Sequence, residues 1–156
     1  MKKLVMSLGL FFLAFTLFSQ NLQVVEGKVY SDSKLYTGYE VSYFENTTQV
    51  KATKHYVNGL EDGKSIMYHP NGAVKAERYW KEGQKDGLWV NYDENGNKLA
   101  EAGYQADKKH GPWNIWNATG QKLFEMHYNQ GVKVGIWRQW DDDGKLIMEK
   151  SFGQNK

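Results

Sequence analysis

Short runs rich in aromatic and β-branched residues alternate along most of the chain with turns that contain glycine. Side chains of a strand point alternately to its two faces, so the run 87–92 would place Trp89 on one face and Val90 and Tyr92 on the other. The apolar positions do not follow the i, i+3, i+4, i+7 spacing of an amphipathic helix. Aromatic and β-branched residues bounded by glycine are typical of short strands. The pattern therefore predicts strands throughout the repeating part of the chain.

These runs recur with a fixed step in the numbering, marked by two series of glycines. The opening glycines are Gly63, Gly87, Gly111 and Gly135, and the closing ones are Gly72, Gly96, Gly120 and Gly144. Both series advance by 24 residues. A constant period of about 20–50 residues indicates a repeat architecture, in which each unit buries surface only against its neighbours.

Each copy is predicted to be a β-hairpin. The first strand precedes the closing glycine, and the second strands are expected at Val74–Tyr79, Leu99–Tyr104, Leu123–Tyr128 and Ile147–Phe152. Dipeptides such as Asn95-Gly96 favour hairpin turns, because glycine adopts positive φ without a steric penalty. The predicted fold class is all-β, with tandem hairpins laid side by side in one elongated antiparallel sheet. The copies would lie near 38–62, 63–86, 87–110, 111–134 and 135–156, after a lead-in strand and linker at 21–37.

The N-terminal segment Met1–Gln20 has the layout of a signal peptide, with Lys2 and Lys3 followed by an apolar run. It predicts export to the periplasm, the outer surface or the extracellular medium. The whole chain has 20 Lys and Arg against 18 Asp and Glu, and loss of Lys2 and Lys3 leaves 18 against 18. This balance argues against nucleic acid as a partner, because nucleic-acid binding needs a basic excess. The chain has no cysteine, so it cannot form disulfides or thiolate metal sites.

The repeated sequence motif also resembles that of a known family. Asp86-Gly87, Trp89, Tyr92, Asn95-Gly96, Leu99 and Tyr104 stand at the spacing of the MORN-repeat-variant motif, and later copies repeat it. The resemblance covers about residues 38–153. It implies a curved array of β-hairpins used for contacts with proteins, and in some proposals with lipids. Bacterial members are often labelled YwqK-type antitoxins of toxin–antitoxin systems, a role for which a signal peptide would not be needed.

Aromatic residues at two repeat positions are the candidate binding or stacking residues. The two sets are Tyr68, Tyr92, Trp116 and Trp140, and Trp89, Trp113 and Trp137. The simpler interpretation is that these rings stack between copies and hold the array together. The alternative is that one set lines a surface that binds a peptide, a glycan or a lipid headgroup through ring faces.

The remaining polar clusters do not predict catalysis. Asp141–Asp143 has the oxygen-rich character that calcium prefers, but it occupies the turn position of the repeat, where a solvated turn is expected. Glutamates recur on the second strand as Glu77, Glu101, Glu125 and Glu149. They would form a row paired with Lys or Arg, and a row does not supply the convergent carboxylates that glycoside hydrolysis needs. We therefore expect no catalytic site, no cofactor and no metal.

Together these features predict an exported, non-catalytic repeat protein that binds another protein of unknown identity. A surface glycan or a membrane reached through exposed aromatics is the second interpretation. An antitoxin is the third.

Overall fold

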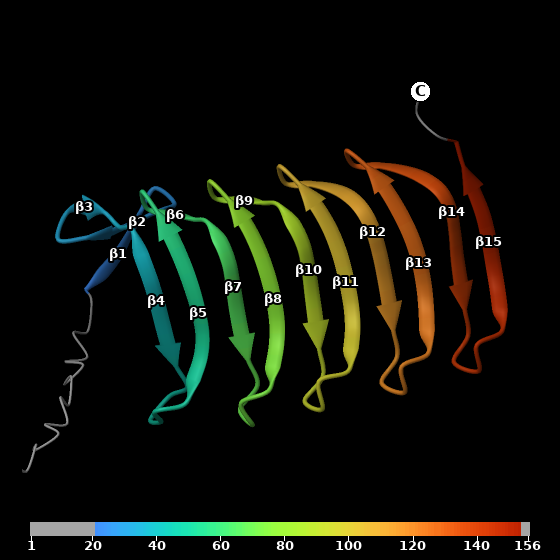
Figure 1. Ribbon diagram of the computed structural model, residues 1–156, viewed down its shortest axis with the longest axis horizontal. Coiled ribbons are helices and arrows are strands. Elements are labelled where there is room, and N and C mark those ends of the chain that lie inside the picture. Colours follow the sequence, from blue (N-terminus) through green and yellow to red (C-terminus); the bar gives the residue numbers. More distant parts are fainter. Residues whose placement is uncertain (1–20, 154–156) are drawn as a thin grey trace, which may run out of the picture.

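The protein is a single-layered, twisted sheet in which the strands follow one another in chain order (Figure 1). The computed structural model describes residues 21–153, and the predicted signal peptide lies outside them. No helix occurs among these residues, so none of them forms a helix long and apolar enough to cross a membrane. The predicted all-β repeat fold is confirmed.

Fifteen strands make up the described part of the chain. The first three are β1 (Leu22–Val25), β2 (Lys28–Ser31) and β3 (Lys34–Leu35), which form a small sheet of their own. The large sheet contains β4 (Gly38–Tyr43), β5 (Val50–Val57), β6 (Leu60–Glu61), β7 (Gly63–Tyr68), β8 (Val74–Lys81), β9 (Gln84–Lys85), β10 (Gly87–Tyr92), β11 (Lys98–Gln105), β12 (Lys108–Trp116), β13 (Lys122–Asn129), β14 (Val132–Trp140) and β15 (Leu146–Phe152). All its pairings are antiparallel, and its two edge strands are β4 and β15.

The strands are joined by two kinds of turn, one at each long edge of the sheet. At one edge, five-residue loops such as 69–73 place a glycine at positive φ, as Gly72 and Gly96 do at 85°. At the other edge, pairs such as Glu82-Gly83 and Gln130-Gly131 have positive φ at both positions and connect strands across two residues. Two positive φ values match the twist of a tight hairpin. The connectors between copies are therefore hairpin turns too, and the chain is one continuous meander.

The small N-terminal sheet closes the first end of the array. Backbone N–H groups of Val29 and Gly59 donate to the carbonyls of Gly59 and Tyr36 at 2.8 and 2.7 Å. Val29, Tyr36 and Tyr56 are buried together, with Leu22 packed against them. The predicted lead-in strand at 21–37 is thus a three-stranded cap. Its contacts cover a ring of β5 that would otherwise face water.

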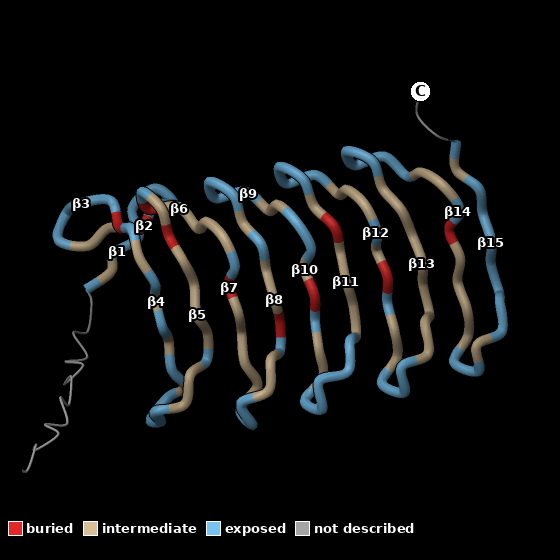
Figure 2. The backbone as a smooth tube through the Cα atoms, in the orientation of Figure 1, coloured by how far each residue is buried: buried red, intermediate tan, exposed pale blue. Residues whose placement is uncertain are grey.

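Burial is spread along the sheet and is not gathered into one interior (Figure 2). The buried apolar residues are Val29, Tyr36, Tyr56, Ala76, Val90 and Trp137. None of the large side chains in the described part falls below 2% exposure. A single layer has no second sheet to cover it, so stability must come from contacts between neighbouring copies.

The bounds of the predicted second strands are off by one residue in β11, β13 and β15 and by two residues in β8. The second strand of the second copy was expected to end at Tyr79, but β8 continues to Lys81. The 24-residue step then makes Trp80, and not Tyr79, the equivalent of Tyr104. Tyr79 points to the other side of the sheet, where 37% of its surface is exposed.

Candidate binding surfaces

The two sides of the sheet carry different side chains. We call the side that bears Trp89, Trp113 and Trp137 the ladder face, and the side that bears Leu88 and Val90 the opposite face. Cross-strand pairing fixes this division, because Trp89 is paired with Ala102 and Val90 is paired with Glu101 on the neighbouring strand. Residues paired across a ladder point to the same side of a sheet.

A continuous row of rings runs along the ladder face. Tryptophans of the first strands alternate with aromatics of the second strands, in the order Trp80, Trp89, Tyr104, Trp113, Tyr128, Trp137 and Phe152. Neighbouring centroids are 4.8–5.4 Å apart, with tilted or edge-on planes. Such geometry is the preferred arrangement of aromatic pairs, each worth about 0.5–1.5 kcal/mol beyond area burial. The row therefore couples every copy from β8 to β15.

Each first-strand tryptophan is also tied to the preceding copy by its indole N–H. Trp89 donates to the carbonyl of Tyr79 at 2.9 Å, and Trp113 donates to that of Gly103 at the same distance. Trp137 donates to the carbonyl of His127 at 3.1 Å. Beside Gly103 and His127 the pairing of the two strands shifts register. The backbone carbonyl of each of these residues is therefore available to accept from the indole. Tryptophan is thus suited to this position by both its ring and its donor.

Lysine side chains lie over the ring row at the connector edge. Lys85, Lys109 and Lys133 place their Nζ atoms 4.1–4.7 Å from the centroid of the tryptophan four residues later in the chain. Each also lies within 4.9–5.5 Å of the next ring along the row. Cation–π attraction of this kind contributes about 0.5–1 kcal/mol at exposed sites.

The second predicted aromatic set lies apart from this row. Tyr68, Tyr92, Trp116 and Trp140 end the first strands, next to the five-residue loops. Among residues 21–153, no ring contact joins one of these four to another. Trp116 instead has the Nζ atoms of Lys98 and Lys122 at 5.5 and 5.7 Å from its centroid. The structure thus brings together one of the two predicted sets and leaves the other separate.

The glutamates form a row on the opposite face, and each has a basic partner. Glu77 pairs with Lys64 at 2.7 Å and Glu101 with Lys98 at 2.7 Å. Glu125 pairs with Lys122 and Arg138, and Arg138 also reaches Glu149 at 2.8 Å. The expected pairing of this row is confirmed.

Hydrogen bonding governs the acidity of the inner glutamates. Burial acts to raise the pKa of Glu101, but hydrogen bonds from Lys98 and Asn114 outweigh it and lower that pKa below its ordinary value. The hydrogen bond from Lys122 is the main cause of the lowered pKa of Glu125. Both carboxylates are therefore charged at neutral pH and held by their partners.

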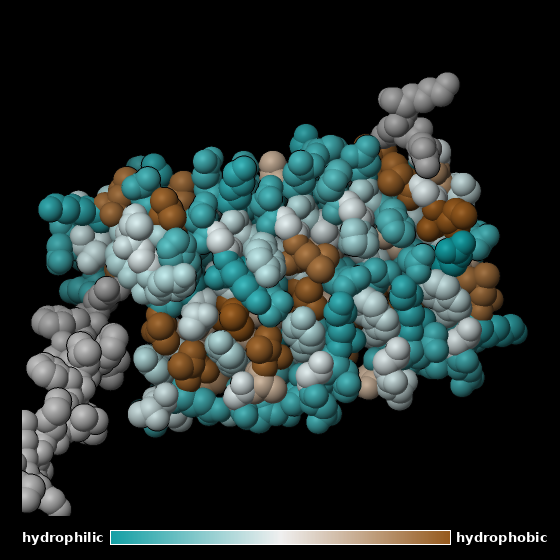
Figure 3. All heavy atoms as spheres, in the orientation of Figure 1, coloured by the Kyte–Doolittle hydropathy of each residue, from teal (hydrophilic) through white to brown (hydrophobic). Residues whose placement is uncertain are grey.

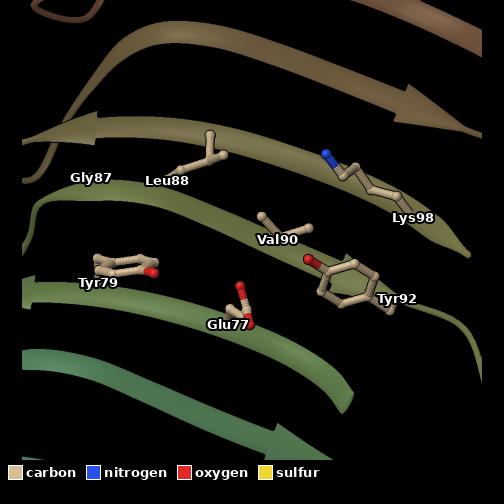
Figure 4. A pocket seen from close by; sticks show the side chains of 7 residues that line it. All are labelled: Glu77, Tyr79, Gly87, Leu88, Val90, Tyr92 and Lys98. Carbon is tan, nitrogen blue, oxygen red and sulfur yellow. The ribbon is translucent and has the colours of Figure 1, made fainter. Parts of the chain in front are cut away.

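Apolar side chains are exposed on the N-terminal half of the opposite face. Tyr39, Val41, Tyr43, Tyr79 and Leu88 are each at least 36% exposed. Figure 3 shows apolar residues gathered over the strands of this half and again over the last strands, with polar residues between them. A shallow depression of about 400 Å³ lies among them, lined by Glu77, Tyr79, Gly87, Leu88, Val90, Tyr92 and Lys98 (Figure 4). Its two long walls come from β8 and β10.

Comparison with known families supports the repeat assignment. A family model described as the MORN repeat variant matches residues 61–82, 85–106 and 133–153. The repeats of this chain belong to the MORN repeat variant family. The segment between the second and third matches folds as the hairpin of β12 and β13, which has the same ring and indole contacts. A search of curated proteins found no match.

The first aspartates of two MORN repeat loops, Asp93 and Asp141, accept hydrogen bonds within their own turns. Asp141 accepts hydrogen bonds from the backbone N–H groups of Asp143 and Lys145 at 3.2 and 2.8 Å. Asp93 does the same for Asn95 and Asn97, and hydrogen bonds led by that from the Asn97 side chain lower the pKa of Asp93. No group of three or more His, Cys, Asp or Glu within residues 21–153 is placed to hold a metal ion.

Sequence reasoning missed four of the seven rings of the row. It singled out the first-strand tryptophans but not their partners, which are Trp80, Tyr104, Tyr128 and Phe152. The signal was available, since these four residues are also 24 positions apart. It was hidden by the change of residue type and by the expectation that the strand ends at Tyr79.

Proposed function

We propose that this protein is an exported, non-catalytic binding module that holds a protein partner on its opposite face. The observation that carries the proposal is the exposure of apolar side chains on a sheet with no covering layer. Tyr79 and Leu88 border a shallow depression, and Tyr39, which is 69% exposed, belongs to the edge strand β4. Contiguous apolar surface of this kind typically marks a contact with another macromolecule.

The arrangement of charge supports a protein partner. The depression has Glu77 and Lys98 beside its apolar floor, which resembles the apolar centre and polar rim of protein interfaces. Both charges are already neutralised within the sheet, by Lys64 and Glu101. A charged ligand therefore gains little there, whereas an apolar side chain of a partner would cover Leu88 and Val90. Binding of proteins is also a general role of MORN repeats.

The absence of catalysis is part of the proposal and has its own support. The carboxylates of the opposite face stand one per copy along the sheet and are engaged in ion pairs. They do not converge on one point, which a reacting substrate would need.

Site-specific photocrosslinking tests the proposed surface. A photoreactive amino acid at Leu88 should give an adduct with one partner in cells that export the protein. The same group at Glu94, an exposed loop residue, is the matched control and should give none. The purified partner should then lose binding to the Leu88→Asp variant. Equal adducts at both positions, or none at Leu88, would exclude this surface.

Cell fractionation tests export. The full chain should be recovered from the envelope or the medium, and a variant lacking residues 2–20 from the cytosol. Recovery of the full chain in the cytosol alone would contradict the proposed location.

A further inference from the structure

A row of lysines without acidic partners runs along the ladder face. Lys85, Lys109 and Lys133 occupy the same position of three successive copies, two residues before the opening glycine. The six ion pairs of the described residues use other cations, namely Lys54, Lys64, Lys98, Lys122 and Arg138. Only aromatic rings lie beneath the ammonium groups of the row.

The ladder face lacks the acids that the opposite face has. By alternation and register, the strand residues that share a side with the rings between β8 and β15 include no Asp or Glu. Basic residues there are Arg78 over Trp89 and Lys150 over Phe152. The four glutamates of the opposite face are all engaged in ion pairs, whereas the basic residues of the ladder face have no acid beside them on these strands.

Asp86 and Asp107 at the connector edge form no ion pair with the row. The carboxylates of Asp86 and Asp107 accept hydrogen bonds from the backbone N–H groups of Ala106 and Lys85. They are engaged with the turn backbone, and neither forms an ion pair with a lysine of the row. The row ends at the first regular copy, where the equivalent residue is Glu61, paired with Lys54 at 2.9 Å.

The lysines are evenly spaced along the long axis of the array. One copy adds two strands, so successive ammonium groups stand roughly 10 Å apart and the row spans roughly 20 Å. Lys133 is exposed, and Lys85 and Lys109 are half-buried against the rings. A straight row of regularly spaced cations is complementary to a linear chain that carries negative charge at regular intervals.

We propose that the ladder face binds an acidic linear polysaccharide, one with a carboxylate on its sugar rings. The polymer would lie along the row, with carboxylates on Lys85, Lys109 and Lys133. The apolar C–H faces of its sugars would rest on the exposed parts of the half-buried rings, such as Trp89, Trp113 and Tyr128. This inference goes beyond the proposed function, since it concerns the other side of the sheet and a different class of ligand.

A polymer fits this surface better than an anionic membrane or an acidic peptide. A membrane presents charge in two dimensions, whereas Lys85, Lys109 and Lys133 form a line near one edge of the sheet. The exposed apolar residues of the ladder face, Ile115 and Met148, lie toward the five-residue loops at the other end of the strands from the lysines. An extended peptide adds most readily to an edge strand through backbone hydrogen bonds, and the lysine row crosses the middle strands of the sheet.

The test is a binding titration of the full mature chain with oligogalacturonate long enough to span three copies. We expect saturable binding that weakens as salt rises, because exposed charges are screened. The variant K85Q/K109Q/K133Q should bind about tenfold more weakly or worse, since three ion pairs are lost together. The variant K85R/K109R/K133R, which keeps the charges, should retain binding.

Matched controls distinguish an effect of the lysine row on binding from effects of net charge and of misfolding. K81Q/K108Q/K145Q removes the same charge from exposed lysines outside the row and should bind like the unchanged chain. Thermal melts of all variants check that the sheet is intact. Photocrosslinking at Leu88 should be unaffected by the row variant, which makes failure here distinguishable from failure of the proposed function.

Three results would overturn the inference. They are equal loss of binding in the row and control triple variants, equal binding of a neutral glucan, and binding of phosphatidylglycerol vesicles or polyglutamate but not of oligogalacturonate.

Discussion

The two faces of this sheet are made by the same strands and are held together in different ways. On the ladder face, seven rings touch in unbroken sequence from Trp80 to Phe152, and indole donors reach back to the preceding copy. On the opposite face, no ring contact joins Tyr92 to Trp116 among the described residues, and ion pairs such as Lys64–Glu77 and Arg138–Glu149 join neighbouring strands. Alternation along each strand lets one 24-residue period encode both surfaces.

The difference shows how a single-layered sheet divides stability and binding. Aromatic contacts on one side couple the copies, so the other side is free to expose apolar residues such as Tyr79 and Leu88. Ion pairs at a surface contribute little to the free energy of unfolding, but they determine which charged side chains remain available for binding. The faces should therefore respond differently to equivalent substitutions.

Removing one ring from each face should give the largest contrast. Trp113→Ala breaks two ring contacts and the hydrogen bond to Gly103, and should cost about 3–5 kcal/mol of unfolding free energy. Trp116→Ala removes a half-buried ring without ring partners, and should cost about 1–2 kcal/mol. Urea denaturation followed by circular dichroism measures both. Equal losses would show that the ladder face has no special role.

A glycine beneath the ladder should give the next largest effect. A Cβ at Gly103 would fall on the carbonyl oxygen of His110, so Gly103→Ala must displace the backbone that presents the acceptor for Trp113. We expect a loss of about 1–3 kcal/mol, the usual cost of overpacking. Gly96→Ala is the control, because open space surrounds it and only its positive φ is penalised, by about 1 kcal/mol. Thermal melts that rank Gly96→Ala as the more damaging change would refute this account of the glycine.

Replacing a carboxylate of the opposite face should lower the free energy of unfolding by a smaller amount. Glu101→Gln keeps the side-chain shape but weakens the bonds from Lys98 and Asn114, and should cost about 0.5–1 kcal/mol. The loss should shrink in high salt, which screens exposed ion pairs. Denaturation at low and high salt measures this, and a loss above that of the ladder-face variant Trp113→Ala would reverse the proposed order of the faces.

Lowering the pH should first weaken the ion pairs of the opposite face. The pKa values of Glu101 and Glu125 are lowered in the folded protein, so their stabilising contribution is complete above the ordinary glutamate value of 4.5 and is lost as pH falls below it. The melting temperature should therefore drop below that pH. The double variant E101Q/E125Q should show a smaller drop, and an unchanged drop would assign the acid sensitivity to other groups.

The repeat period and the strands were predictable from the sequence because glycine spacing and alternation depend on local chemistry. The contacts between rings on different strands could not be predicted from the sequence. Trp89 and Tyr104 belong to different strands, and their contact depends on register and on shifts such as the one between Ala102 and Tyr104. The tight connector turn at Ala106-Asp107 was also missed, since neither residue is glycine although both have positive φ.

The unpaired state of the lysines could not be predicted either. Lys85 and Lys98 look alike in the sequence, but one lies over Trp89 and Tyr104 and the other pairs with Glu101. Which carboxylate a lysine reaches depends on the face to which it points. Only the structure settles that for residues in connectors and beside bulges.

The most direct test of the central claim is a set of nuclear Overhauser measurements between aromatic protons in solution. The account predicts an unbroken series of contacts through Trp89, Tyr104, Trp113, Tyr128 and Trp137, and none between Tyr92 and Trp116. A broken series along the ladder face, or a contact between the rings of the opposite face, would contradict it.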